Sequence, residues 1–314
     1  TALSQVQRFF ELCRRGRSRC TEVADGGIAQ LEELTALKRI FLDGTSVTPP
    51  GLRRFREATP NAVVHVDPAT LTSFRFFGER IASGHWDDDY NLVSLNFHET
   101  EVPDTVLEEL KNRPETRSIR QLTLTQATVS VRGMKHVGDL KELESINLGE
   151  TRLSATGLAH LSALTNLRSP HLWGTQLTDN DLANLKGMTN LEHLSLGPPF
   201  TDAGLIHLKG LTNLRDLNLN SSQIDGSGLV HLSGLVNLEV LNLSRTQLTD
   251  DGLIHLRGLM NLRYLNLDGS QIDDSGLVHL SGLIKLEVLT LSHTQLSDDG
   301  LIHLRGLTSL RQLY

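Results

Sequence analysis

The chain has 314 residues, with 30 Lys and Arg against 37 Asp and Glu, a formal net charge of −7 at pH 7. This acidity, without a basic stripe interleaved with aromatic residues, argues against a nucleic-acid partner. No apolar run approaches the roughly 20 residues of a membrane span, and no motif for a metal ion or a cofactor occurs in the sequence.

Residues 1–24 are predicted to form an N-terminal cap, because apolar residues recur at near-helical spacing from Val6 to Cys13. The cap holds both cysteines of the chain, Cys13 and Cys20. We interpret them as reduced thiols in a cytoplasmic protein, and a disulfide staple in a secreted protein is the alternative. The residues from Thr1 do not have the pattern of a signal peptide, and because the chain starts without Met we expect that an upstream segment has been removed, which leaves both compartments open.

Three segments are expected after the cap. Residues 25–66 are predicted to form a short repeat array, and residues 92–314 the main array. Residues 67–91 interrupt the pattern as an insertion or joint, and they carry the aromatic residues Phe74, Phe76, Phe77, Trp86 and Tyr90. We interpret these aromatic side chains as filling the core of a junction, since aromatic residues are mostly buried. A protruding loop that contacts a partner is the alternative.

The main array repeats a unit of about 24 residues. Apolar pairs such as Leu217/Leu219 and Leu241/Leu243 predict short strands with one face inward. Three residues beyond most strands lies a Ser or Thr, whose oxygen we expect to satisfy backbone donors of the turn. Three residues later a Ser, Thr or Asp is expected to cap a short helix. Such units cannot bury their apolar face alone, so neighbouring units must stack.

The repeats are most regular toward the C-terminus. Residues 222–266 and 270–314 are near copies, which differ at ten of 45 aligned positions. The TDxGLxHLxxL pattern resembles the bacterial leucine-rich repeat family, and its 24-residue variety is similar to repeats of planctomycete proteins. The resemblance implies an α/β fold: a curved leucine-rich repeat solenoid with parallel strands on the concave face and short helices on the convex face. It also implies protein binding, no enzyme activity, no catalytic residue and no cofactor.

A histidine recurs at one helix position of the repeat. The row consists of His136, His160, His207, His231, His255, His279 and His303. Such a row could sense pH or bind a transition metal. We interpret the side chains instead as packing against their neighbours, because a metal site needs converging ligands rather than a straight row.

The strand face holds the candidate binding site. One strand position is rich in Asn and Thr, which offers both hydrogen-bond donors and acceptors, and most of these side chains are expected to be solvated. In the middle of the array the repeat is least regular, and aromatic and proline residues gather there. We predict a partner-binding patch composed of His171, Trp173, His193, Pro199, Phe200, Arg245 and Tyr264.

The expected function is therefore a non-enzymatic module that binds a protein partner on the concave face. One alternative is the substrate-recognition arm of a ubiquitin-ligase-like bacterial effector, since some effectors carry similar repeats. Another is a self-assembling structural array. The last strand, at Leu313 and Tyr314, would present an open edge. We expect either a longer native chain or an end-to-end homodimer through that strand.

Overall fold

The computed structural model describes residues 23–34, 36–42, 45–66, 83–86, 92–97, 101–112 and 116–314. They form two compact units: the first runs to Asn96 and includes Asn112–Ile119, and the second comprises Phe97–Lys111 and Arg120–Tyr314. Cys13 and Cys20 of the expected cap lie outside the described residues, as do Phe74, Phe76, Phe77 and Tyr90 of the expected joint. The boundaries of the four expected segments therefore stay a prediction.

The first unit contains one strand–helix repeat and the strand of a second. Its elements are α2 (Asp25–Ala29), β1 (Arg39–Phe41), α3 (Pro49–Ala58) and β2 (Val63–His65). β1 and β2 pair in parallel, and their core consists of Ile28, Ile40, Leu42, Val47, Leu52 and Phe55. As expected, the Thr48 hydroxyl caps α3 by accepting a hydrogen bond from the Gly51 N–H at 3.2 Å.

The first unit also contains an antiparallel pair of strands that the repeat pattern does not predict. β3 (Ser83–Trp86) pairs with β4 (Leu92–Asn96), with an irregularity between His85 and Trp86. β3 lies within the expected joint, where the run Ser-Gly-His-Trp shows no apolar alternation. The sequence therefore carries no strand signal there.

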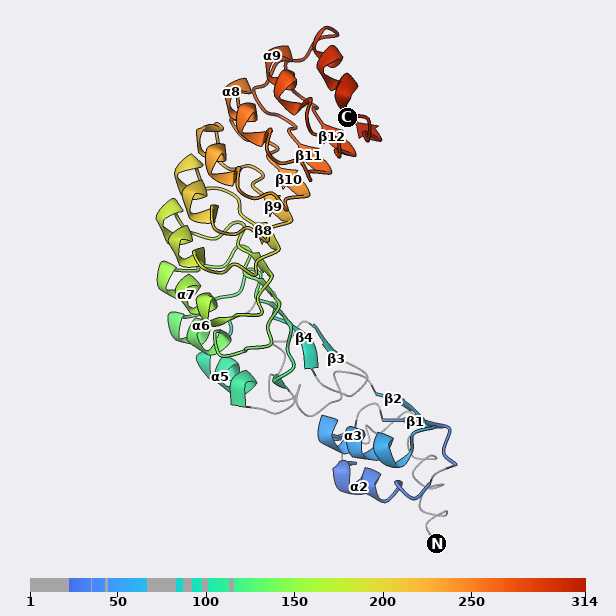
Figure 1. The fold of residues 1–314 in the computed structure, drawn as a ribbon. Helices are drawn as coiled ribbons and strands as arrows, with labels where there is room; N and C mark the ends of the chain where they lie inside the picture. Colours follow the sequence, from blue (N-terminus) through green and yellow to red (C-terminus); the bar gives the residue numbers. More distant parts are fainter. Residues whose placement is uncertain are drawn as a thin grey trace. The chain divides into compact units, whose positions relative to one another are not determined.

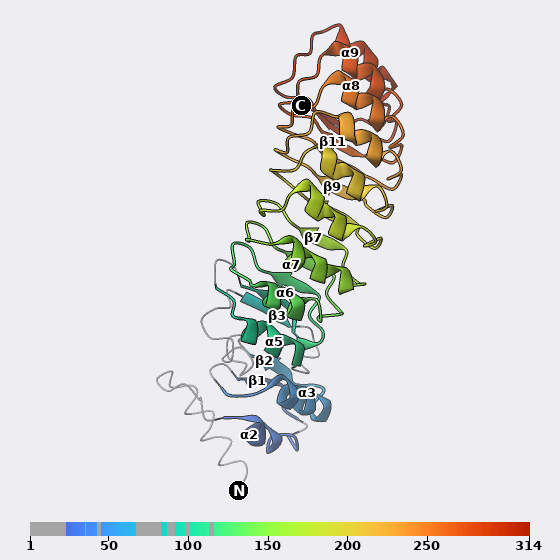
Figure 2. The ribbon, with the colours of Figure 1, turned by 90° about the vertical axis from the view of Figure 1, so that its left-hand side faces the viewer.

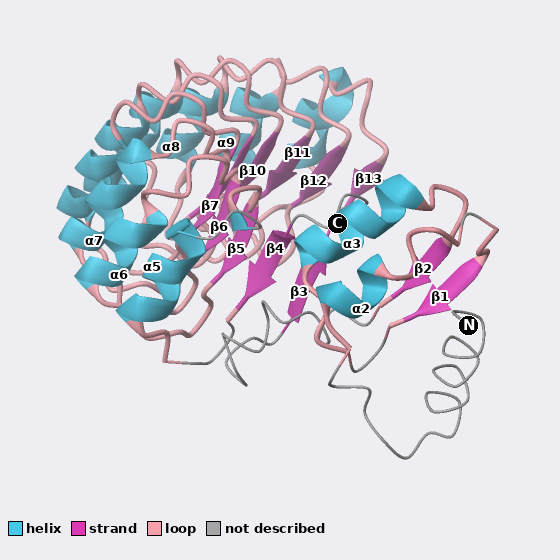
Figure 3. Cartoon of the chain, turned by 90° about the horizontal axis from the view of Figure 1, so that it is seen from below, coloured by secondary structure: helices cyan, strands magenta, loops and turns pink. Residues whose placement is uncertain are grey.

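The second unit stacks its strands in chain order, from β5 to β13. They are β5 (Gln121–Thr123), β6 (Ser145–Asn147), β7 (Ser169–His171), β8 (His193–Ser195), β9 (Asp216–Asn218), β10 (Val240–Asn242), β11 (Tyr264–Asn266), β12 (Val288–Thr290) and β13 (Gln312–Leu313). Neighbouring strands are parallel and pair equivalent residues, such as Leu241 with Leu265. The strands of this unit lie on the inner, concave side of a curved stack (Figures 1 and 3).

Short helices cover the outer side of the second unit (Figure 2). The α-helices are α5 (Asp104–Asn112), α6 (Val131–Val137), α7 (Ala155–Ala159), α8 (Asp250–Leu253) and α9 (Asp274–Leu277). The 3-10 segments are η4 (His160–Ala163), η5 (Asp179–Leu185), η6 (Asp202–Leu208), η7 (Ser227–Leu232), η8 (Ile254–Leu256), η9 (Val278–Leu280) and η10 (Gly300–Gly306). A 24-residue unit leaves few residues for the helix, and the longer rise of the 3-10 turn lets them cover the required distance.

Leucines from both layers fill the space between strands and helices. The inward strand residues Leu217, Leu219, Leu241 and Leu243 are fully buried, as is Leu229 on η7. Burying one such side chain contributes about 1.5–3 kcal/mol, so the stacked leucines supply the main stabilisation of the unit.

The Ser and Thr residues that follow the strands by three positions, here called the hydroxyl column, make a different hydrogen bond from the one expected. The Thr246 hydroxyl donates to the carbonyl of Leu243 at 2.7 Å, and the Ser222 hydroxyl donates to that of Leu219 at 2.6 Å. The column therefore satisfies a backbone acceptor at the strand end rather than a backbone donor of the turn. All of these four groups are buried.

An aspartate at the start of a helix ties several repeats to the next one. Asp179 accepts hydrogen bonds from the backbone N–H of Thr201 at 2.9 Å and from its hydroxyl at 2.6 Å. A Cβ on Gly204 would lie 2.5 Å from an oxygen of the same carboxylate. Gly204, by having no side chain, therefore leaves the space that the aspartate of the preceding repeat occupies.

An alternating row of arginines and glutamates precedes the strands of the second unit. It consists of Arg120, Glu144, Arg168, Glu192, Arg215, Glu239, Arg263, Glu287 and Arg311. Glu239 lies 2.6 Å from Nη1 of Arg215 and 3.8 Å from Nε of Arg263. Each interior member has an oppositely charged neighbour on both sides, a pattern that a single repeat does not reveal.

Candidate functional site

Four asparagines on the strand face form a row of oriented amides. This asparagine row consists of Asn147, Asn218, Asn242 and Asn266. Each Oδ1 accepts a hydrogen bond at 3.0 Å from the backbone N–H two residues later. The Nδ2 groups of Asn147, Asn218 and Asn242 have no acceptor among the described residues, whereas that of Asn266 faces the Tyr264 hydroxyl at 3.4 Å. The row therefore offers donors, not the mixture of donors and acceptors expected from the sequence.

Trp173 follows β7 and is the most prominent side chain of this face. It is 43 % exposed. Its indole lies over Gly149 of the preceding repeat, where a Cβ would meet Nε1 at 2.7 Å. Gly149 has no positive φ, so its backbone does not require glycine. The missing side chain instead makes room for the indole.

His171 lies two residues before Trp173, at the end of β7, and is half-buried. Burial lowers the pKa of His171 below its ordinary value of 6.5, His193 lowers it further, and Asp216 partly offsets both. The His171 imidazole is therefore neutral at pH 7. His193 is exposed, and its Nδ1 lies 3.8 Å from Asp216.

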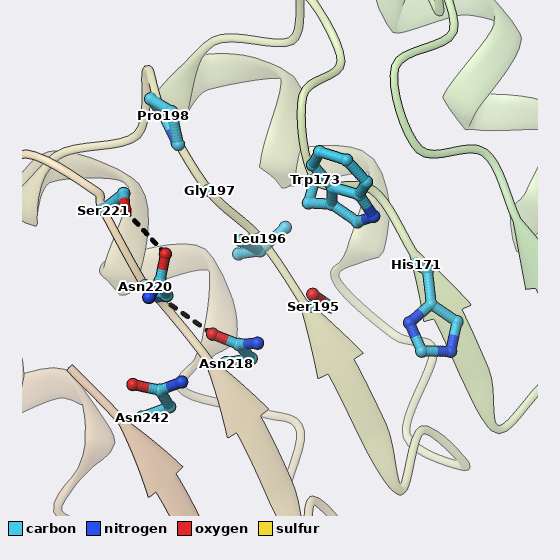
Figure 4. Close-up of a pocket in the computed structure, with 10 residues that line it drawn as sticks. All are labelled: His171, Trp173, Ser195, Leu196, Gly197, Pro198, Asn218, Asn220, Ser221 and Asn242. Atoms are coloured by element: carbon cyan, nitrogen blue, oxygen red, sulfur yellow. Dashed lines mark hydrogen bonds between the residues drawn. The ribbon is translucent and has the colours of Figure 1, made fainter. Parts of the chain in front are cut away.

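An open pocket of about 490 Å³ connects these features (Figure 4). His171 and Trp173 form one side, and the asparagines at the end of β9 and β10 and just beyond β9 form the other. The lining consists of His171, Trp173, Ser195, Leu196, Gly197, Pro198, Asn218, Asn220, Ser221 and Asn242. Asn220 is held by the Ser244 hydroxyl at 2.7 Å and by the Ser221 hydroxyl at 2.6 Å. The pocket therefore combines one aromatic wall with fixed, uncharged polar groups.

The structure brings together only part of the patch predicted from the sequence. His171 and Trp173 line the pocket, while the exposed Pro199 and His193 lie near it without lining it. Phe200 is only 1 % exposed, so its assignment to a contact surface is wrong.

Phe200 occupies the inward position that Leu177 and Ile224 hold in the adjoining repeats, and both of those are buried. Phe200 lies in the repeat that is one residue short, where the segment Gly197–Pro199 displaces the pattern and hides this register in the sequence.

Arg245 and Tyr264 also lie outside the pocket lining. Arg245 is an exposed residue with a left-handed backbone, at φ 55°. Asn218 and Asn242 lie in a copied asparagine column, which gives no reason to prefer one repeat, and Asn220 lies two residues later in a column that varies between repeats. What distinguishes these asparagines is that they lie on the other side of β8 from His171 and Trp173, the two residues that depart from the repeat pattern.

The histidine row lies on the helix side. His136 is 8 % exposed, and neither of its ring nitrogens has a hydrogen-bond partner in the described part of the chain. Burial lowers the pKa of His279, and Arg257 lowers it further. No group of three or more His, Cys, Asp or Glu among the described residues is arranged to hold a metal ion. No described helix combines the length and apolar character needed to cross a membrane.

Comparisons with known proteins agree with this architecture. The family model described as "Leucine Rich repeat" matches residues 210–233, 235–256, 258–281 and 282–304. An internalin, InlF, from Listeria monocytogenes has a similar structure, with 21% identity and a TM-score of 0.58 over 90% of this chain and 82% of that one. Internalin C2 from the same organism shares 22% identity at a TM-score of 0.49, over 73% of this chain and 86% of its own.

The likeness to InlF concerns the fold alone. No curated protein matches the chain by sequence. The family match is to the leucine-rich repeat in general, so the planctomycete variety stays a prediction.

Proposed function

We propose that the second unit, in which four leucine-rich repeats are matched between residues 210 and 304, is a protein-binding module whose partner contacts the strand face around His171 and Trp173. One observation carries the proposal: an exposed tryptophan is held in place at the middle of that face. Tryptophan is among the residues most enriched at the energetic centres of protein interfaces.

The surroundings of Trp173 support binding because they are already ordered. The indole lies over Gly149, and the carbonyl groups of Asn218 and Asn242 are held by the backbone. Side chains that are fixed before association lose less conformational entropy when a partner binds. The face therefore offers an aromatic anchor and oriented donors at little ordering cost.

We propose recognition rather than catalysis at this face. His171 is the one titratable side chain of the pocket lining, and it makes no hydrogen bond to the hydroxyl of Ser195 on the neighbouring strand. A nucleophile needs a base within hydrogen-bond reach, and the pocket holds no such pair. The alternatives of a substrate-recognition arm of a bacterial effector and of a self-assembling array stay predictions. The end-to-end homodimer also stays a prediction, and light scattering of the purified chain tests it.

Photo-crosslinking tests the face directly. A photoactivatable phenylalanine analogue replaces Trp173 in one variant and Ile206 in the other. Ile206 is a matched control, because it is 51% exposed on the helix side. In lysate of the source organism, we expect the analogue at position 173 to capture a discrete protein and the one at 206 to capture none. Capture only from position 206 would place the binding surface on the helices and overturn the proposal.

A further inference from the structure

We propose that the pocket between Trp173 and the asparagine row binds a neutral sugar, as one or two pyranose rings of a glycan. The proposal deepens the proposed function and rests on it, because it uses the same strand face. The glycan belongs either to a free polysaccharide or to a glycosylated partner protein, and both sources present the same chemistry to the pocket.

The aromatic wall is the first reason. The indole of Trp173 is packed on Gly149 and remains 43 % exposed. The face of an aromatic ring carries partial negative charge and its C–H edges partial positive charge. The C–H groups on one face of a pyranose are weakly positive, so a sugar ring complements the exposed indole.

The orientation of the asparagines is the second reason. Oδ1 of Asn218 accepts from the Asn220 N–H, and Oδ1 of Asn242 accepts from the Ser244 N–H and hydroxyl. Their Nδ2 groups have no acceptor in the described part of the chain. The two residues pair across adjacent parallel strands, which lie about 4.8 Å apart. Neighbouring hydroxyl groups of one sugar can accept from both amides.

This use of Oδ1 also separates a sugar from a nucleobase. An asparagine that reads a base such as adenine uses Oδ1 and Nδ2 together, as acceptor and donor. In this pocket the carbonyl half is occupied by the backbone, so only the donor half is available. A hydroxyl group can rotate to accept from such a donor, whereas the edge of a base is rigid.

The charge and size of the pocket are the third reason. The lining has no Lys, Arg, Asp or Glu, and His171 is held neutral by its environment. An anionic ligand such as a phosphate would find no charged partner there. The volume of about 490 Å³ lies within the usual range for small-molecule sites. The exposed lining combines apolar surface with several polar side chains, which suits an uncharged ligand that has both C–H faces and hydroxyl groups.

Calorimetry with defined sugars tests the proposal on the full chain. The probes are neutral tetrasaccharides of glucose, mannose and N-acetylglucosamine, with adenosine as the competing class. We expect at least one tetrasaccharide to bind, and Trp173→Ala to weaken it about tenfold or more. No tetrasaccharide binding at about 10 mM, together with no glycan-dependent glycoprotein binding, would overturn the proposal. Binding of adenosine as tight as that of the best sugar would also overturn it.

An isosteric pair of variants isolates the amide donors. Asn242→Asp keeps the acceptor that holds the turn and removes the Nδ2 donor of the pocket. Asn266→Asp makes the same change in the same row, one strand outside the pocket lining. We expect Asn242→Asp to weaken sugar binding about tenfold and Asn266→Asp to change it less than about twofold. Equal effects of both variants would show that charge alone, and not the donor, reduces binding.

A glycoprotein with neutral high-mannose glycans separates the two sources from each other and from the proposed function. Binding of free tetrasaccharide as tight as that of the glycoprotein supports a free polysaccharide. Binding of the glycoprotein alone, lost after enzymatic removal of its glycans, supports a glycosylated partner. Binding that survives deglycosylation contradicts the sugar site but agrees with a protein-binding face. If neither the tetrasaccharides nor the glycan of the glycoprotein binds, but the analogue at position 173 still captures a protein, only the sugar proposal is overturned.

Discussion

The indole Nε1 of Trp173 lies 2.7 Å from the point that a Cβ on Gly149 would occupy. Two residues 24 positions apart in the sequence are therefore in contact: the tryptophan of one repeat packs on the glycine of the preceding repeat. The position of the Trp173 indole on the strand face depends on the missing side chain at Gly149, and this dependence can be tested without changing the tryptophan.

Gly149→Ala should displace the indole with little loss of stability. The clash is with the far end of a side chain, which can move, and Gly149 has no positive φ. We expect the free energy of unfolding to fall by no more than about 1 kcal/mol, while acrylamide quenching of tryptophan fluorescence and ligand binding both change.

Gly226→Ala is the contrasting variant. Gly226 has φ +110°, and its added Cβ would lie 2.5 Å from the backbone of Gly252. A backbone neighbour cannot yield as a side chain does, so we expect a loss of about 1–3 kcal/mol. Chemical denaturation measures the free energy of unfolding of both variants. An equal loss in the two would contradict the expectation that the Trp173 indole can move away from a side chain at position 149.

Thr246→Val should reveal the contribution of the hydroxyl column. The substitution keeps the shape of a side chain that is 5 % exposed and removes its bond to the Leu243 carbonyl. We expect a loss of about 1–3 kcal/mol, because a buried acceptor is left without that partner. Thr308→Val on the exposed surface is the control and should change stability by less than about 0.5 kcal/mol. A neutral Thr246→Val would mean that another donor replaces the hydroxyl.

Glu239→Arg should destabilise the alternating charge row. It would place three arginines in succession, because Glu239 lies between Arg215 and Arg263. These groups are partly exposed, so we expect a loss of no more than about 1 kcal/mol at low salt. The loss should shrink near 1 M salt, where screening is strong.

Glu142→Arg makes the same charge change at an exposed residue that forms no ion pair among the described residues. Its effect on the denaturation midpoint is the control for net charge. A loss at Glu239 that matches the control, or that is independent of salt, would show that the row does not act through electrostatics.

Much of the fold could be predicted from the sequence, because each column of the repeat reports a local cause. The leucine pairs mark strands, and the cap column is confirmed where the Ser130 and Ser154 hydroxyls accept from the N–H three residues later. The alternating charges of the row before the strands could not be predicted from one repeat, because their period is two repeats. Their meaning depends on which residues become neighbours across strands.

The candidate site could be predicted only in part. His171 and Trp173 stood out because they depart from a copied pattern. Asn218 and Asn242 follow the pattern, and only the hydrogen bonds of their carbonyl groups show that donors remain. Phe200 was misplaced because a repeat that is one residue short obscures which side of the chain faces inward.

The pKa of His171 should report the electrostatics of the pocket. Burial lowers it from 6.5, His193 lowers it, and Asp216 raises it. His193→Gln should therefore raise the pKa of His171, and Asp216→Asn should lower it further. NMR titration of the imidazole carbon and nitrogen shifts measures both. Shifts of the same sign in the two variants would contradict the arrangement of these three side chains.

The same pKa fixes the sign of the pH dependence. Because the folded value lies below that of the unfolded chain, the unfolded state takes up the proton first as pH falls. The contribution of His171 to stability is therefore complete above pH 6.5 and declines as pH falls through the folded pKa. His171→Gln should reduce the loss of stability over this interval, which denaturation at a series of pH values measures. An unchanged slope would assign the acid sensitivity to other groups.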